Sequence, residues 1–369
     1  MNLRHVATVM MFVFVTGAFS VCPAQESSGF VYTMTNSKIN AILAFERAGN
    51  GRLSGPVSVP TGGAGTGSNL GSQGALALSE DGHWLFAVNA GSNQVSVFER
   101  RRDGLKLTDV VASGGTLPES VAVSGELVYV LNTGAPANIS GFSFDDDKGT
   151  LNPIPNSIRP LSAASPGAPQ IGFDRTGSLL FVTEKATNQI DSYEVQEDGT
   201  TIGPHPQNSV GLTPFGFAFD RRNRLFVTEA FGGQANKSAT SSYEVDDNGV
   251  LEAIDGSVAT NQTAACWIAI TRNGKFAYAT DTGSGAITGY RISHSGRLSL
   301  LDANGVSAPT GNGSSPVDLA LTRATDFLYD INVGTGTLIG WRVQQSDGKL
   351  LFLNQVEKIP ASSTGLVAQ

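Results

Sequence analysis

Residues 214–253 read PFGFAFDRRNRLFVTEAFGGQANKSATSSYEVDDNGVLEA, and this stretch contains the pattern that decides the fold. Two apolar runs, at 217–219 and 225–229, flank a polar turn, and two further runs flank Asn248-Gly249. A polar residue followed by glycine between two β-forming runs supplies the positive backbone angles that a tight hairpin needs. The stretch therefore predicts four strands, which we call inner, second, third and outer.

Seven turns of this kind occur along the chain, at intervals of 45 to 53 residues. An aromatic residue stands five or six positions before each turn, and an aliphatic residue follows the glycine within three positions. The turns are Asn50-Gly51, Asp103-Gly104, Lys148-Gly149, Asp198-Gly199, Asn248-Gly249, Ser295-Gly296 and Asp347-Gly348. Repeats of this length with several strands each indicate a β-propeller. We therefore expect an all-β fold, a seven-bladed β-propeller with four strands per blade.

Six of the seven units are complete, and the seventh is divided between the two ends of the chain. The N-terminal part supplies a second strand at 30–33 and a third at 42–45, and 365–368 supplies the missing inner strand. Pairing the two terminal strands in one sheet closes the ring and removes an open sheet edge. No linker interrupts the repeats, so we expect one propeller domain over residues 25–369.

The first 24 residues have a different character. Arg4 precedes an apolar run over 6–19, and small residues follow it up to Ala24. This order is typical of a secretory signal, and the apolar run is too short for a stable membrane span. We expect cleavage after Ala24 and a periplasmic or extracellular protein. Acylation of Cys22 is the alternative, although Phe19 and the residue before Cys22 fit that pattern poorly.

The net charge limits the kinds of partner that the chain can bind, and the cysteine content limits its disulfides. The formal net charge is −8 at pH 7, and an acidic protein repels phosphate backbones, so we expect no nucleic acid as partner. Removal of the signal leaves Cys266 without a second cysteine, so an internal disulfide is excluded. We expect Cys266 to pack as a small apolar side chain.

Polar side chains end the second strands of the expected blades. In a propeller these strand ends and the starts of the inner strands lie on one face, around the mouth of a central channel. Long connections such as 61–74 lie on this face, where propeller ligands bind. The expected ligand-binding residues are Asn89, Asn132, Gln170, Trp267, Asp281, Asp318 and Asn332, and Glu184 and Glu229 complete the ring.

A ring of carboxylates and amides suits a polyhydroxylated ligand or a hard divalent cation such as Ca²⁺ or Mg²⁺. If a metal binds, we expect Glu184, Glu229, Asp281 and Asp318 to hold it. The other interpretation is structural, because Asn and Asp at the end of a strand often cap the next turn by bonding their own backbone. The sequence leaves both interpretations open.

Several phrases of the repeat have a counterpart in a known family. They are ALALSEDGHWLFAVN at 75–89, QVSVF at 94–98, and LFVTE at 180–184 and again at 225–229. In these phrases the chain resembles the seven-bladed propeller lactonase family, which includes propeller-type 6-phosphogluconolactonases and carboxymuconate cyclases. The resemblance covers the mature chain and implies a hydrolase that opens a lactone.

The resemblance also implies which residues act. Opening a lactone needs a base that activates water and a cation or donor that stabilises the oxyanion. Glu229 matches the glutamate of the family, so we expect Glu229 and Glu184 to be catalytic. Where the family has a histidine or arginines, this chain has Gln170, Phe215-Gly216, Thr282 and Val317. Lys185, Lys237 or a metal acting as Lewis acid would have to replace those groups.

Two functions follow from these observations. One is a secreted lactonase-like hydrolase that acts on a sugar-acid or related lactone at the loop face. The other is a non-catalytic propeller that binds a carbohydrate, a cell-envelope component or a protein partner on the same face. The fold does not decide between them.

Overall fold

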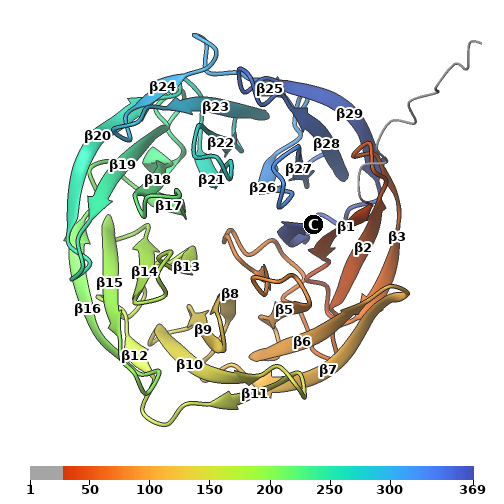
Figure 1. Ribbon diagram of the computed structural model, residues 1–369, viewed down its shortest axis with the longest axis vertical. Helices are drawn as coiled ribbons and strands as arrows, with labels where there is room; N and C mark the ends of the chain where they lie inside the picture. Colours follow the sequence, from red (N-terminus) through yellow and green to blue (C-terminus); the bar gives the residue numbers. More distant parts are fainter. Residues whose placement is uncertain (1–27) are drawn as a thin grey trace, which may run out of the picture.

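The computed structural model describes residues 28–369, so the expected signal segment and its cleavage site lie outside the described residues. Figure 1 shows a ring of sheets around a central axis, with the chain running once around it. Residues 28–369 form thirty strands and one short 3-10 helix, η1 (Phe231–Gly233). The strands are grouped into seven separate sheets. The expected all-β, seven-bladed propeller is confirmed.

Each sheet, or blade, runs from an inner strand at the channel to an outer strand at the rim. Blades 1 to 3 contain, in that order, β30 (Thr364–Ala368), β1 (Gly29–Met34), β2 (Ala41–Arg47) and β3 (Leu53–Pro60); β4 (Leu76–Leu78), β5 (Trp84–Asn89), β6 (Gln94–Arg101) and β7 (Gly104–Ala112); and β8 (Pro118–Ser124), β9 (Leu127–Asn132), β10 (Asn138–Asp145) and β11 (Thr150–Pro153).

The remaining blades follow the same order. Blades 4 to 7 contain β13 (Gln170–Phe173), β14 (Leu179–Glu184), β15 (Gln189–Val195) and β16 (Thr201–Asn208); β17 (Pro214–Phe219), β18 (Leu225–Glu229), β19 (Ala239–Val245) and β20 (Leu251–Ala259); β21 (Ala265–Ile270), β22 (Phe276–Asp281), β23 (Ala286–Ile292) and β24 (Leu298–Leu300); and β26 (Pro316–Leu321), β27 (Phe327–Asn332), β28 (Thr337–Val343) and β29 (Leu350–Glu357). In blades 3 and 6 the outer strand is interrupted, and β12 (Arg159–Pro160) and β25 (Ala308–Pro309) complete it.

The two ends of the described chain meet in blade 1. Strand β30 pairs antiparallel with β1, with Val31 opposite Ala368 and Thr33 opposite Leu366. The backbone N–H of Gln369 also donates to the carbonyl of Phe30, at 2.9 Å. The expected closure of the ring by the terminal strands is therefore confirmed.

The repeated turns and their aromatic residues have the expected roles. All seven turn glycines have positive φ, including +87° at Gly51 and +77° at Gly199, which explains the choice of glycine. The aromatic residues before the turns are buried between blades. In three blades a second-strand tyrosine also bonds the turn of the next blade, as Tyr329 does when its hydroxyl donates to the Gly51 carbonyl at 2.7 Å.

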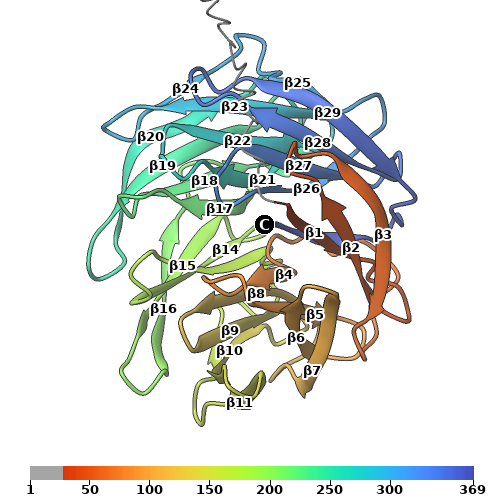
Figure 2. The ribbon, with the colours of Figure 1, turned by 45° about the vertical axis from the view of Figure 1, so that its right-hand side comes forward.

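The strand order gives the ring two unlike faces, and Figure 2 shows the ring obliquely. The turns from inner to second strand and from third to outer strand lie together on what we call the hairpin face. The second-to-third connections and the crossings between blades lie on the loop face. Cys266 is buried, and burial raises the pKa of its thiol to about 12, as expected of a packed side chain. Within residues 28–369, no helix has the length and apolar character of a membrane span.

Candidate functional site

The polar residues that end the second strands are all placed on the loop face, but their side chains turn into their own blades. Asn89, Asn132, Glu184, Glu229, Asp281 and Asn332 are each the last residue of a second strand, and each is 0% exposed. Most of their hydrogen-bond partners lie in the third strands and in the segments that cross between blades. Each therefore makes hydrogen bonds to protein groups, although the side-chain oxygens of Asn132 and Asn332 have no partner among the described residues.

Glu229 shows the arrangement most clearly. Its Oε1 accepts a hydrogen bond from the Gly211 N–H at 2.9 Å and another from the Ser241 hydroxyl. Its Oε2 accepts from the Ser257 hydroxyl at 2.6 Å. Burial raises the pKa of Glu229, and these three donors partly offset that rise. A carboxylate held by three protein donors ties the crossing segment to the blade, and the catalytic role expected from the resemblance remains a prediction.

Glu184 is held in a similar way in blade 4. Both of its oxygens accept from Ser162, through the backbone N–H and the side-chain hydroxyl, and the Thr187 hydroxyl donates to Oε2 at 2.5 Å. The Ser162 N–H also donates to Asp191 at 3.0 Å. Burial and the nearby Glu184 carboxylate raise the pKa of Asp191, because two negative charges in one apolar site repel each other.

Asp281 and the three asparagines are also engaged. The Thr288 hydroxyl donates to Asp281 at 2.6 Å, and burial raises the Asp281 pKa to about 7. Asn89 accepts from Asn40 and Thr61 and donates to Ser96. The asparagines of blades 3 and 7 donate within their own blades, Asn132 to Ser140 and Asn332 to Asp330. These contacts are side chain to side chain, and they differ from the backbone capping of the next turn that the structural interpretation had expected.

The four carboxylates expected to share a metal do not meet. Glu184, Glu229, Asp281 and Asp318 belong to four successive blades, 4 to 7. Within residues 28–369 there is no group of three or more His, Cys, Asp or Glu side chains that could hold a metal ion. The expected donor set therefore does not fit a Ca²⁺ or Mg²⁺ centre, because Glu184, Glu229 and Asp281 turn into their own blades and, of the four, Asp318 alone lines the cavity.

The loop-face end of the channel is crossed by residues 69–74, which we call the strap. The Ser72 carbonyl accepts from the Trp267 indole N–H of blade 6 at 2.8 Å, and the Ser72 hydroxyl donates to the Glu119 carbonyl of blade 3. The Gly71 carbonyl accepts from Lys185 Nζ of blade 4 at 3.2 Å. The strap thus ties three blades together over the mouth where a ligand was expected. Trp267 and Lys185 hold it in place.

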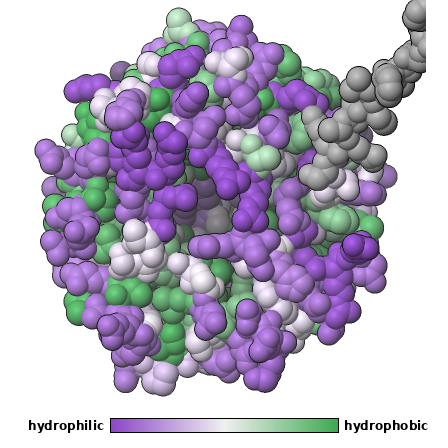
Figure 3. Space-filling view, in the orientation of Figure 1, coloured by the Kyte–Doolittle hydropathy of each residue, from purple (hydrophilic) through white to green (hydrophobic). Residues whose placement is uncertain are grey.

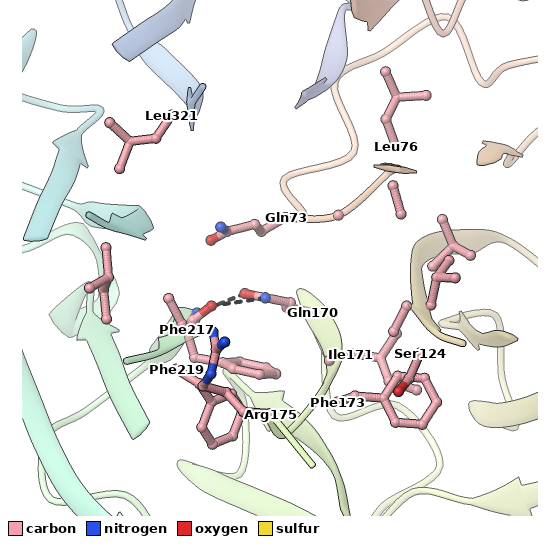
Figure 4. Close-up of a pocket in the computed structure, with 18 of the residues that line it drawn as sticks. Gln73, Leu76, Ser124, Gln170, Ile171, Phe173, Arg175, Phe217, Phe219 and Leu321 are labelled. Atoms are coloured by element: carbon pink, nitrogen blue, oxygen red, sulfur yellow. Dashed lines mark hydrogen bonds between the residues drawn. The ribbon is translucent and has the colours of Figure 1, made fainter. Parts of the chain in front are cut away.

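Two glutamine side chains complete this end of the channel. The amide of Gln73 donates to the Ile268 carbonyl and accepts from the Ile268 N–H, at 2.9 and 3.2 Å. Gln170 makes the same pair of bonds with Phe217, at 3.0 and 2.7 Å, as Figure 4 shows. Because inner strands are sheet edges, their outward N–H and C=O groups lack a neighbouring strand. These two amides satisfy the edges of β21 and β17.

Below the strap lies a central cavity of about 830 Å³. Figure 3 shows a hollow at the middle of the ring, bordered mainly by hydrophilic residues. Its walls come from the inner strands, including Leu76, Ile171, Phe217 and Leu321 (Figure 4). The buried end holds Gln73, Gln170 and Asp318, and the other end is lined by exposed residues of inner-to-second turns. The cavity therefore opens on the hairpin face.

Asp318 differs from the other carboxylates of the expected site, because one of its oxygens has unused bonding capacity. It lines the cavity and is 2% exposed. Its Oδ1 accepts the Leu319 N–H at 2.8 Å, whereas its Oδ2 has no hydrogen-bond partner among the described residues. Burial raises the pKa of this carboxyl well above its ordinary value, and the backbone N–H groups of Leu319 and Leu366 offset part of that rise.

The opposite end of the cavity carries positive charge. Arg175, Arg272 and Arg323 line it, and each is exposed in the turn between an inner and a second strand. Glu80 is an acidic residue exposed at the same rim. The sequence analysis did not select these arginines. The signal was present, since the inner-to-second turns of blades 4, 6 and 7 contain Arg175, Arg272 and Arg323.

Comparisons with known proteins agree with the expected family resemblance. Residues 24–167 match the model of the family described as Lactonase, 7-bladed beta-propeller. No curated protein sequence matches the chain.

Solved structures match the whole described ring. A putative 6-phosphogluconolactonase from Bacteroides fragilis is 17% identical, with a TM-score of 0.72, over 93% of this chain and 99% of that chain. The periplasmic gluconolactonase PpgL from Pseudomonas aeruginosa is 16% identical, with a TM-score of 0.72, over 92% and 98%. A protein from Lactobacillus plantarum is 17% identical, with a TM-score of 0.74, over 92% and 99%. At these identities the structures share a fold with this chain.

Proposed function

We propose that the protein is a lactonase-type hydrolase that takes a sugar-acid or related lactone into the central cavity. The observation that carries this proposal is Asp318, a carboxyl beside the cavity whose Oδ2 has no hydrogen-bond partner among the described residues. This oxygen is itself buried, so the side chain has to rotate to bring it to the lactone. The match of residues 24–167 to the lactonase family model supports the reaction class. The cavity volume of about 830 Å³ lies within the range of small-molecule sites.

The expected chemistry is the addition of water to the lactone carbonyl carbon, followed by cleavage of the bond to the ring oxygen. A base must take a proton from the water, and the ring oxygen must receive one. Asp318 can do both in turn, because a carboxyl with a raised pKa is a stronger base when ionised and retains a proton at higher pH. The arginines at the open end would attract a negatively charged or polar lactone and its acid product.

A panel of lactones assayed with four proteins tests this proposal. Asp318→Asn removes the free carboxyl, and Glu229→Gln tests the residue that the family resemblance implies. Asp326→Asn is the matched control, because Asp326 is exposed in the β26–β27 turn of the same blade and does not line the central cavity. We expect turnover by the wild type and by Asp326→Asn, and its loss in Asp318→Asn.

The other outcomes are equally informative. Loss of turnover in Glu229→Gln alone would refute the proposal that the central cavity is the active site, and it would favour a site on the loop face. No turnover of any lactone by the wild type would leave the second candidate function, a non-catalytic propeller that binds a carbohydrate, an envelope component or a protein. The full hydrogen bonding of Glu184 and Glu229 favours that candidate, because groups held by protein donors serve structure more readily than proton transfer.

We further propose that the protein acts outside the cytoplasm, periplasmic or extracellular, after removal of residues 1–24. The basic start, the apolar run and the small residues up to Ala24 support this proposal. N-terminal sequencing of the protein from a periplasmic or culture fraction should begin at Gln25. An intact Met1 in purified cytoplasmic protein, with none in the exported fractions, would contradict it.

A further inference from the structure

Basic side chains gather in a second hollow, away from the central cavity, between blades 5 and 6. This hollow, the blade 5–6 cleft, has a volume of about 360 Å³ and lies on the hairpin face. Its walls come from the β17–β18 turn, the β21–β22 turn and the β23–β24 turn, with Ser346 of blade 7 at one edge. The charged residues that line it are Asp220, Arg221, Arg222, Arg224, Lys275, Arg291 and His294.

The acidic side chain in the cleft, Asp220, is already neutralised. It accepts from Nε of Arg224 at 2.9 Å and from a second guanidinium nitrogen at 2.5 Å, and both residues are buried. The remaining Arg224 nitrogen donates to the His294 carbonyl at 3.0 Å. This buried pair therefore fixes the two blades together, and it adds no net charge to the cleft.

Four cations in the cleft have no such compensation. Arg221, Arg222, Lys275 and Arg291 are exposed, and in residues 28–369 none of them forms an ion pair with a carboxylate. They come from two turns and from the end of strand β23, on two blades, so the fold brings them together. The protein as a whole carries a net charge of −8, so the positive cleft opposes the charge of the whole molecule.

Contacts hold three of these cations in position, two of them across the cleft and one within blade 6. Arg221 packs closely over Gly274 of the neighbouring blade, where an added β-carbon would lie 3.4 Å from Arg221 Cγ. Arg222 contacts the ring nitrogen of His294. The Arg291 guanidinium lies over the Phe276 ring at 5.1 Å from its centroid. Guanidinium groups held in this way lose little further freedom when they bind an anion, and their planar forks match the oxygens of a phosphate group.

We propose that the blade 5–6 cleft binds a phosphomonoester group. Such a group carries between one and two negative charges near neutral pH and three acceptor oxygens, which suits several donors that converge from different sides. The cleft volume leaves room for a small organic body attached to the phosphate. The site is independent of the lactonase proposal, because the residues that line the cleft do not line the central cavity.

Calorimetric titration of the full chain with glycerol 3-phosphate at low ionic strength tests the proposal. We expect saturable binding, weakened about tenfold by Arg222→Gln and by Lys275→Gln, because each removes a charge-assisted contact. Arg102→Gln is the matched control, since Arg102 is exposed in a hairpin-face turn of blade 2 and does not line the cleft. Thermal unfolding of each variant verifies that these surface changes leave the fold intact.

A second arm separates a soluble phosphomonoester from a lipid headgroup. Vesicles of phosphatidylcholine with and without phosphatidic acid are sedimented with the same four proteins. Binding of glycerol 3-phosphate alone identifies a soluble ligand, and additional retention on phosphatidic acid that Arg222→Gln abolishes identifies a headgroup. No binding of either probe, or equal weakening by Arg102→Gln and Arg222→Gln, would overturn the assignment of the cleft.

Discussion

Removing the last strand is the most direct test of how the ring is held closed. A chain that ends at Ser362 lacks β30, which supplies the inner strand of blade 1 and lies next to β26 and β4 of the adjoining blades. It also lacks Gln369, whose carbonyl accepts from Arg47 Nε at 2.8 Å. The truncation therefore exposes one edge of β1 and the inner flanks of two further blades.

The register gives the magnitude of the effect. Four residue pairs join β30 to β1, and Leu366 is 6% exposed. Backbone hydrogen bonds contribute roughly 0.5–1.5 kcal/mol each, and burial of a leucine side chain contributes about 2 kcal/mol. We therefore expect a loss of about 5 kcal/mol, which is a large part of the roughly 5–15 kcal/mol by which domains are stable.

Urea unfolding followed by circular dichroism measures this loss. We expect the truncated chain to unfold at a much lower urea concentration and over a broader range, because an open ring loses cooperativity. Val367→Ala is the control, since Val367 is half-buried and its substitution leaves the strand pairing intact. If the truncated chain had the same midpoint and slope as the full chain, closure by the terminal strands would not stabilise the ring.

Two further changes test other parts of the ring. Tyr329→Phe removes the hydroxyl that bonds the buried Gly51 carbonyl, so we expect a loss of about 1–2 kcal/mol in urea unfolding; an unchanged midpoint would show that this bond contributes nothing. Asp281 has a pKa of about 7 in the folded chain because of burial, against an ordinary 3.8. Between these pH values the folded chain retains a proton that the unfolded chain has released, so the free energy of unfolding should fall as the pH rises from about 4 to 7. Asp281→Asn cannot ionise and should show a smaller fall; an identical pH dependence would contradict the assignment.

The fold could be predicted because its signals are local and repeated. Each turn glycine has the positive φ that the hairpin needs, and each preceding aromatic is buried. Closure of the ring was predicted from a count of strands. The expected strand at 30–33 had no inner strand beside it in the sequence, and the expected strand at 365–368 had no sheet of its own. These inferences needed the strand order alone, and the structure confirms them.

The direction of the strand-end side chains could not be predicted in the same way. A polar residue at the end of a second strand has the same sequence signature whether it faces the channel or its own blade. Its direction depends on donors that are distant in sequence, such as Gly211 and Ser257 around Glu229. The position of the strap could not be predicted either, because its bonds join residues far apart in sequence, such as Ser72 and Trp267, which are 195 residues apart.

The position of the cavity mouth follows from what covers one end of the channel and leaves the other end open. The strap and the two glutamine amides occupy the loop-face end of the channel, where long connections had suggested a ligand. Short hairpin turns cannot fold over the other end, so their charged side chains remain exposed around it. Loop length indicates where a chain can cover a channel as well as where it can bind a ligand. In this ring residues 69–74 cover one end of the channel, and arginines of the short turns line the other.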